Sequence, residues 1–131
     1  MKTDSNFRIL VVDDTRAVQV FVKSLLSPFR FVQLTSAMNG VEGLQRAKEG
    51  PFDLILLDWE MPMMTGPELL KELRGAGIQI PVIMMTSKNA ANNIEEMLHA
   101  GAAEYIMKPF TLDILLAKMA LVSGREFTDA A

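Results

Sequence analysis

Five short apolar runs alternate with five stretches of helical periodicity, and this alternation constrains the fold more than any other feature of the sequence. Strands that alternate with helices form βαβ units, and such units build a parallel sheet. The apolar runs predict strands at residues 8–12, 31–36, 53–57, 80–85 and 104–107. A helix is predicted after each strand, and glycine or proline closes the first four helices.

The runs at residues 8–12, 53–57 and 80–85 are apolar almost throughout, as expected for strands covered on both faces, whereas residues 31–36 alternate more, as an edge strand does. We therefore predict an α/β fold, a doubly wound five-stranded parallel sheet of flavodoxin-like order 2-1-3-4-5 with five helices. The 131 residues suit one domain at 1–131, with a core at about 7–122 and a frayed polar tail at 123–131.

Two helix details accompany this prediction. In the fourth helix, Asn89 is expected to act as the N-terminal cap, with Ile94, Met97 and Leu98 facing inward. Thr111 is expected to cap the fifth helix.

Composition excludes several classes of function. The chain has no cysteine and one histidine, so disulfides, thiolate metal sites and multi-histidine zinc sites are ruled out. A net charge of −3 without a basic stripe argues against direct binding of nucleic acid. No apolar run has the length of a membrane span, and Asp4 and Asn6 interrupt the stretch that a signal peptide would need. We therefore expect a cytoplasmic protein without a membrane association.

Three carboxylates stand at the ends of two predicted strands. Asp13 and Asp14 follow the first strand, and Asp58 follows the third. In the predicted order the winding reverses between these two strands, and ligands bind there, outside the carboxyl ends. Clustered carboxylates repel each other unless a cation is present, and hard oxygen ligands favour Mg²⁺, with Mn²⁺ as a second candidate. The sequence therefore predicts a metal site at this edge of the sheet.

Two further strand ends contribute to the same edge. Thr86 follows the fourth strand and offers a hydroxyl, and Lys108 follows the fifth and offers an ammonium group. Carboxylates, a hydroxyl and a lysine suit phosphoryl transfer, which depends mostly on positioning and charge neutralisation. Asp58 is the best candidate nucleophile, because a carboxylate can accept a phosphoryl group to form an acyl phosphate.

Four motifs now make a family resemblance visible: VVDD at 11–14, LLDWEMPMMTG at 56–66, MMTS at 84–87 and YIMKPF at 105–110. With their order and spacing, the chain resembles the receiver domain of two-component response regulators, particularly the single-domain chemotaxis kind, over roughly residues 7–122. Each motif alone is a weak signal, and the four together on a fivefold βα pattern are a strong one.

The resemblance implies a role for each residue of the site. Asp58 would be the phosphoacceptor for a histidine kinase or phosphotransfer protein, Asp14 would bind the metal directly, and Asp13 would bind it mainly through water. The backbone carbonyl of Glu60 would complete the metal ligands. The chain would be a self-phosphorylating and self-dephosphorylating switch rather than a turnover enzyme.

The resemblance also implies how the switch works. Thr86 would hydrogen-bond the phosphoryl group, Lys108 would pair with it, and Tyr105 would change rotamer as Thr86 moves. Pro109 would follow a cis peptide bond. Phosphorylation would remodel the face made by the fourth helix, fifth strand and fifth helix, where a downstream protein would bind. The domain would be a monomer or a weak, phosphorylation-linked dimer, and the early end after the fifth helix suggests a stand-alone regulator.

Glu60 and Lys88 depart modestly from the family pattern at positions that flank the phosphorylation site. We hypothesise that these opposite charges pair across its mouth and set the lifetime of the phosphorylated state. An exposed pair contributes only about 0–1 kcal/mol to stability, so the effect would be kinetic.

Two alternatives remain at this point. A magnesium-dependent phosphatase of the haloacid dehalogenase type would also use a strand-terminal aspartate such as Asp58, although its acidic pair normally follows the nucleophile and little length is present for a cap. A binding module that signals without phosphorylation is the other alternative, and partner binding unchanged in Asp58→Asn would support it.

Overall fold

The computed structural model describes residues 6–87 and 94–127. The strands are β1 Phe7–Val12, β2 Val32–Ala37, β3 Leu54–Asp58, β4 Val82–Thr86 and β5 Glu104–Met107. The helices are α1 Arg16–Leu26, α2 Gly40–Glu49, α3 Gly66–Gly75, α4 Ile94–His99 and α5 Leu112–Ser123. Both sets match the predicted alternation.

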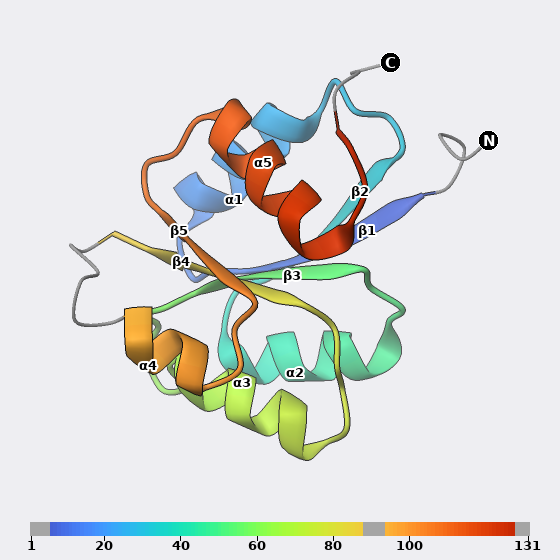
Figure 1. Ribbon diagram of the computed structural model, residues 1–131. Coiled ribbons are helices and arrows are strands. Elements are labelled where there is room, and N and C mark those ends of the chain that lie inside the picture. The colour runs from blue at the N-terminus through green and yellow to red at the C-terminus, as the bar shows by residue number, and fades with distance from the viewer. Residues whose placement is uncertain (1–5, 88–93, 128–131) are drawn as a thin grey trace.

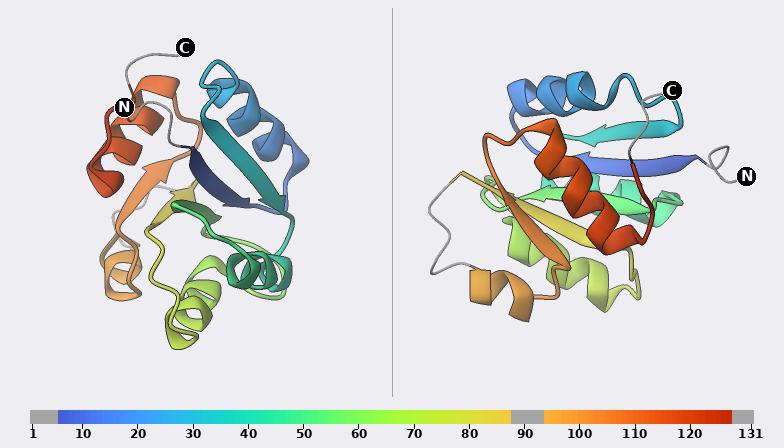
Figure 2. Two further views of the ribbon diagram at one scale, coloured as in Figure 1. Left: turned by 90° about the vertical axis from the view of Figure 1, so that its right-hand side faces the viewer. Right: turned by 45° about the horizontal axis from the view of Figure 1, so that its top comes forward.

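All neighbouring strands pair in parallel, in the order β2-β1-β3-β4-β5. Helices α1 and α5 cover one face of the sheet, and α2, α3 and α4 cover the other (Figure 1). The two views of Figure 2 show the same three layers and the twist of the sheet. The predicted fold class and strand order are therefore confirmed.

Alternate residues of the central strands serve the two faces of the sheet. Ile9 and Val11 of β1 belong to the core beneath α1 and α5, whereas Leu10 and Val12 belong to the core beneath α2 and α3. This period of two is the geometry of a strand, and it explains why a strand buried on both faces is apolar throughout.

Helix caps fix where several helices begin. The Asn39 side chain accepts the N–H of Glu42 at the start of α2, and Thr65 and Glu68 form a capping box at the start of α3. Thr111 accepts the N–H of Ile114, as predicted for α5. The predicted cap Asn89 lies outside the described residues.

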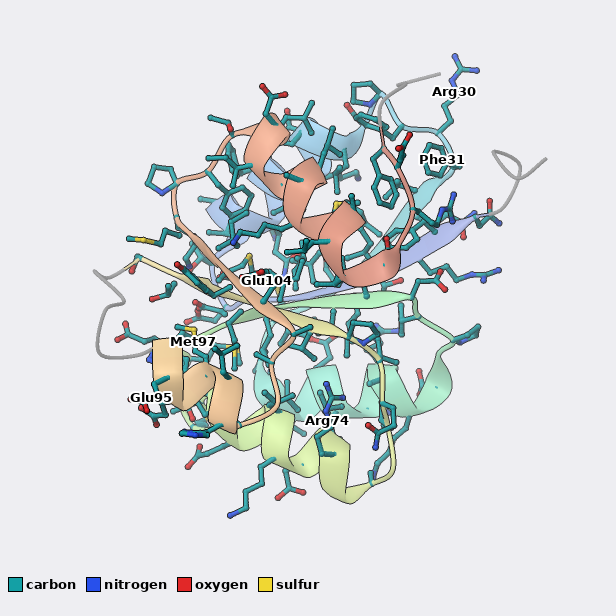
Figure 3. The ribbon with its side chains drawn as sticks, in the orientation of Figure 1. Arg30, Phe31, Arg74, Glu95, Met97 and Glu104 are labelled. Atoms are coloured by element: carbon teal, nitrogen blue, oxygen red, sulfur yellow. The ribbon has the colours of Figure 1, made fainter. Side chains whose placement is uncertain are left out.

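Helix α4 differs from the prediction at one position, Leu98. Met97 is fully buried on the side facing the sheet, and Glu95 lies on the outer side (Figure 3). Leu98 is 52% exposed, so the prediction that it faces inward was wrong. The physical reason is that α4 covers the edge strand β5, where less of its circumference meets the sheet. The side chain of Ile94, also predicted to face inward, lies outside the described part of the structure.

The chain beyond α5 returns to the end of the sheet where β1 begins (Figure 1). Phe127 is buried, meets the ring of Phe7 edge-on at 5.0 Å and stacks on Phe31 at 6.1 Å. The Arg125 guanidinium lies 5.2–5.7 Å from the centroids of these three rings. Figure 3 shows Phe31 beside this segment. Residues 124–127, part of the tail at 123–131 that was predicted to be frayed, thus pack against the domain. Residues 128–131 of that tail lie outside the described residues.

Within the described residues, none of the helices combines the length and apolar character needed to cross a bilayer.

Candidate functional site

The side chains of the site stand at the carboxyl edge of the sheet because the strands are parallel. Asp58 and Thr86 are the last residues of β3 and β4, and Asp13 and Lys108 directly follow β1 and β5. Backbone hydrogen bonds hold these ends in register: Asp13 N–H donates to the Ala37 carbonyl at 3.1 Å, and Lys108 N–H donates to the Thr86 carbonyl at 2.7 Å. The four predicted strand ends therefore gather at one edge.

Lys108 bridges two carboxylates. Its Nζ lies 3.1 Å from Oδ1 of Asp58 and 3.3 Å from Oδ2 of Asp13. The second oxygen of Asp13, Oδ1, accepts the backbone N–H of Thr15 at 2.8 Å. Asp13 is fully buried and Asp58 is 5% exposed, so these hydrogen bonds to charged groups form where water screens them little.

The environment shifts the ionisation of Asp58. Burial and the neighbouring charge of Asp13 raise the pKa of Asp58 from 3.8 to about 6, although Lys108 and a hydrogen bond from the Glu60 backbone N–H act in the opposite direction. Burial lowers the pKa of Lys108, but the charges of Asp58 and Asp13 outweigh burial and leave that pKa raised. At neutral pH the site therefore holds more negative charge than one lysine neutralises.

The three carboxylates meet the requirements of a hard divalent cation. Asp13, Asp14 and Asp58 each place an oxygen within 4.8 Å of the others. All three donors are carboxylate oxygens, which suit Mg²⁺ rather than a soft metal. Asp14 is exposed, so water can reach the cluster, as Mg²⁺ requires because it keeps several of its waters. The residues present therefore fit a magnesium ion, with excess negative charge for it to offset.

The remaining predicted residues lie around this cluster. Thr86 is 1% exposed, and the peptide bond between Lys108 and Pro109 is cis, as expected. Tyr105 is half-buried in β5, and the Lys118 Nζ lies 4.7 Å above its ring.

Glu60, two residues beyond Asp58 in the sequence, is exposed. It lines a groove of about 660 Å³ together with Trp59, Met61 and residues of α3. Lys88, the expected partner of Glu60, lies outside the described residues.

Gly66 is a residue of the site that sequence reasoning missed. Its N–H donates to the Trp59 carbonyl at 3.1 Å, and a Cβ at this position would overlap the carbonyl oxygen of Asp58. In the sequence this glycine stands out only as the last residue of the LLDWEMPMMTG motif, and nothing there indicates its close approach to Asp58.

The five-stranded parallel sheet and the acidic site at its carboxyl edge are typical of receiver domains, and comparison with known proteins supports this class. A family model, the response regulator receiver domain, matches residues 9–120. The chain belongs to this family. The curated "Response regulator MprA" of Mycobacterium tuberculosis is 39% identical over 125 residues, which are 95% of this chain and 54% of that protein. The chain thus spans about half the length of the curated relatives it matches.

Solved structures show the same similarity. The receiver domain of Francisella response regulator 1452 is 32% identical with a TM-score of 0.83, covering 92% of this chain and 98% of that one. Chemotaxis protein CheY4 of Vibrio cholerae is 29% identical with a TM-score of 0.81, covering 88% and 97%. A CheY-like receiver domain protein from Methanospirillum hungatei is 34% identical with a TM-score of 0.82, covering 92% and 95%.

Membership in this family has direct consequences. Receiver domains are phosphoacceptor modules of two-component signalling, and their partner is a histidine kinase. The acidic cluster is typical of their magnesium site. The match favours a receiver domain over the phosphatase of the haloacid dehalogenase type.

Proposed function

We propose that this chain is a phosphorylation switch in which Asp58 accepts a phosphoryl group from a histidine kinase or phosphotransfer protein in a magnesium-dependent reaction. The observation that carries the proposal is the buried contact between Lys108 and both Asp58 and Asp13, beside an oxygen of Asp14, in a chain of the receiver family. A carboxylate nucleophile, a cation and a hard-metal site are thereby gathered at one edge of the sheet.

In the proposed step, an oxygen of the Asp58 carboxylate attacks the phosphorus atom of a phosphohistidine. The new O–P bond forms as the P–N bond breaks, and the electron pair of that bond returns to the imidazole. With a pKa of about 6, Asp58 is mostly ionised at neutral pH and can act as the nucleophile. Lys108 offsets charge on the transferred oxygens, and the Thr86 hydroxyl donates a hydrogen bond to one of them.

The metal would be held by Asp14, by Asp58, by the backbone carbonyl of Glu60 and, through water, by Asp13. Mg²⁺ is the expected ion and Mn²⁺ the second candidate. The engaged oxygens of Asp13 support an indirect role for this residue, because Oδ1 accepts from Thr15 and Oδ2 from Lys108. When bound, the ion supplies positive charge that neutralises the phosphoryl oxygens.

The phosphoryl group would then bias a two-state surface. Thr86 would move toward it, Tyr105 would change rotamer, and the face of α4, β5 and α5 would change its affinity for a downstream protein. The half-buried position of Tyr105 on this face supports the proposal. On this proposal the chain is a single cytoplasmic receiver domain, a monomer or a weak phosphorylation-linked dimer, and a switch rather than a turnover enzyme.

Glu60 and Lys88 would pair across the mouth of the site and thereby set the lifetime of the phosphorylated state. Glu60 is exposed beside Asp58, where it can influence how water reaches the acyl phosphate. We expect Lys88→Ala to change the rate of dephosphorylation without changing stability. An unchanged rate would refute this assignment.

The test is incubation with Mg²⁺ and acetyl phosphate, followed by intact-mass measurement. The wild type should gain the mass of one phosphoryl group, and the gain should disappear with EDTA or in Asp58→Asn. Asp53→Asn is the matched control. Asp53 directly precedes β3, at the end of that strand opposite to Asp58, and accepts the backbone N–H of Arg8. Equal phosphorylation of Asp58→Asn and wild type would refute the proposal, and steady turnover of a small phosphate ester would point to a phosphatase instead.

A further inference from the structure

Gln19 of α1 makes an unusual set of contacts at the carboxyl edge of the sheet. Its side-chain Nε2 lies 3.1 Å from each of three backbone carbonyl oxygens, those of Val11, Asp13 and Ala37. All three are acceptors, so only the NH₂ side of the amide can face them. One half-buried side chain thus joins the ends of β1 and β2.

These contacts act on the backbone that carries two of the carboxylates. The carbonyl of Asp13 belongs to the planar peptide unit that joins Asp13 to Asp14. A hydrogen bond to this oxygen therefore fixes the plane from which both side chains leave. The Ala37 carbonyl, which Gln19 also contacts, accepts the N–H of Asp13 at 3.1 Å. The peptide unit before Asp13 is therefore held by Ala37, the one after it by Gln19, and Gln19 contacts Ala37 as well.

We propose that Gln19 is a positioning residue for the acidic cluster, which orients Asp13 and Asp14 for the magnesium ion by holding the backbone between them. This inference rests on the proposed function, because it concerns the metal site assigned there. A purely structural role, in which the amide only satisfies carbonyls at a strand end, would contribute to folding stability and leave metal affinity unchanged.

Three substitutions separate these roles. Gln19→Leu removes the donors without adding charge, and Gln19→Glu keeps the shape but places a carboxylate against three carbonyl oxygens. Gln19→Arg restores N–H donors on a long side chain and is the rescue variant. Lys23→Leu is the control, since Lys23 lies one turn further along α1 and, with Gln19, lines a groove between α1 and β2.

The first measurement is the Kd for Mg²⁺ of each folded variant, by calorimetry and by the fluorescence of Trp59, the only tryptophan. We expect Gln19→Leu to weaken binding about tenfold, as is typical when a group that orients metal ligands is lost. Gln19→Glu should weaken it further, Gln19→Arg should restore most of it, and Lys23→Leu should match the wild type.

The second measurement is made without metal. Hydrogen exchange of the Thr15 amide, which donates to Asp13, should accelerate in Gln19→Leu relative to amides in the middle of β1. Exchange and Kd both unchanged would overturn the inference, and so would faster exchange with an unchanged Kd, because the role would then be structural only. If the wild type binds Mg²⁺ and is phosphorylated while Gln19→Leu binds equally well, this inference alone fails. If the wild type binds no Mg²⁺, the proposed metal site fails and this inference with it.

Discussion

The Nζ of Lys108 lies 3.1 Å from Oδ1 of Asp58, and this contact links the ends of β5 and β3 across the intervening strand β4. Both side chains are mostly buried, with exposed fractions of 17% for Lys108 and 7% for Asp58. Since the same Nζ also contacts Asp13, two buried carboxylates share one cation. The ionisation of the site and the stability of the fold are therefore coupled.

Asp58→Asn should stabilise the metal-free protein at neutral pH. The pKa of Asp58 is raised from 3.8 to about 6, so its contribution to the unfolding free energy is fully present below about pH 4 and is lost as the pH rises through 6. The shift alone corresponds to about 3 kcal/mol. We expect a gain of about 1–2 kcal/mol at pH 7, because Lys108 loses one ionised partner in the variant.

Urea unfolding in EDTA at pH 4 to 7, followed by circular dichroism, measures this difference. The advantage of Asp58→Asn should shrink toward zero near pH 4, where the wild-type carboxyl is protonated. A difference that stays constant over this range would show that the gain arises from packing and not from ionisation.

Lys108→Met should destabilise the protein by about 2–4 kcal/mol at pH 7, because removing one partner leaves buried charges uncompensated. Lys118→Met is the control, since its ion pair with Glu104 at 3.1 Å is more exposed and should contribute less than about 1 kcal/mol. The loss should be partly recovered in the double variant Lys108→Met/Asp58→Asn, in which one of the two carboxylates is neutral. A double variant no more stable than Lys108→Met would contradict this account.

Gly66→Ala should lower the unfolding free energy by about 1–3 kcal/mol, because the added methyl group overlaps the Asp58 carbonyl and forces the backbone to shift. It should also slow phosphorylation, since the displaced residue is the proposed phosphoacceptor. Gly75→Ala is the matched control: beyond its chain neighbours and its own helix backbone, no atom lies within 4 Å of a Cβ there, and alanine in α3 should be neutral or stabilise by up to about 0.5–1 kcal/mol. Equal effects of the two substitutions would refute the role of close approach.

Met63→Asn should raise the unfolding free energy by about 0.5–1 kcal/mol. Met63 has a φ of 71°, where asparagine is tolerated better than other L-residues, and its side chain is 90% exposed, so little packing is lost. Met63→Leu should bring no gain, because it leaves the backbone conformation equally unfavourable. Thermal unfolding of both variants provides the comparison.

Much of the fold could be predicted from the sequence, because strands that are buried on both faces consist almost entirely of apolar residues. Residues 104–107 were predicted and are β5, and the continuous apolar runs became the strands covered on both faces. Asp13, Asp58, Thr86 and Lys108 could be brought together without coordinates, since the carboxyl ends of parallel strands share one edge. What this required was the strand order, which the pattern of βαβ units restricts to a few choices.

The features that escaped prediction depend on contacts that no periodicity encodes. Leu98 follows the spacing of an inward-facing residue, but α4 lies over an edge strand and leaves this side chain exposed. Phe127 lies outside any periodic element, and its burial comes from two distant aromatic rings. Gly66 and Gln19 contact backbone atoms of other segments. The sequence pattern around a glycine or a glutamine does not indicate which distant backbone atoms it contacts.

The contact between Phe7 and Phe127 brings the beginning of β1 and the chain beyond α5 within 5.0 Å, measured between ring centroids. A linker of a few residues would therefore join these points, and new ends opened at the exposed turn around Gly77 would leave every strand pair intact. In such a circular permutant the acidic edge would lie at the end of the sheet opposite to Gly77. A reporter domain fused at Gly77 would therefore be attached to α3 and β4 without covering the acidic edge.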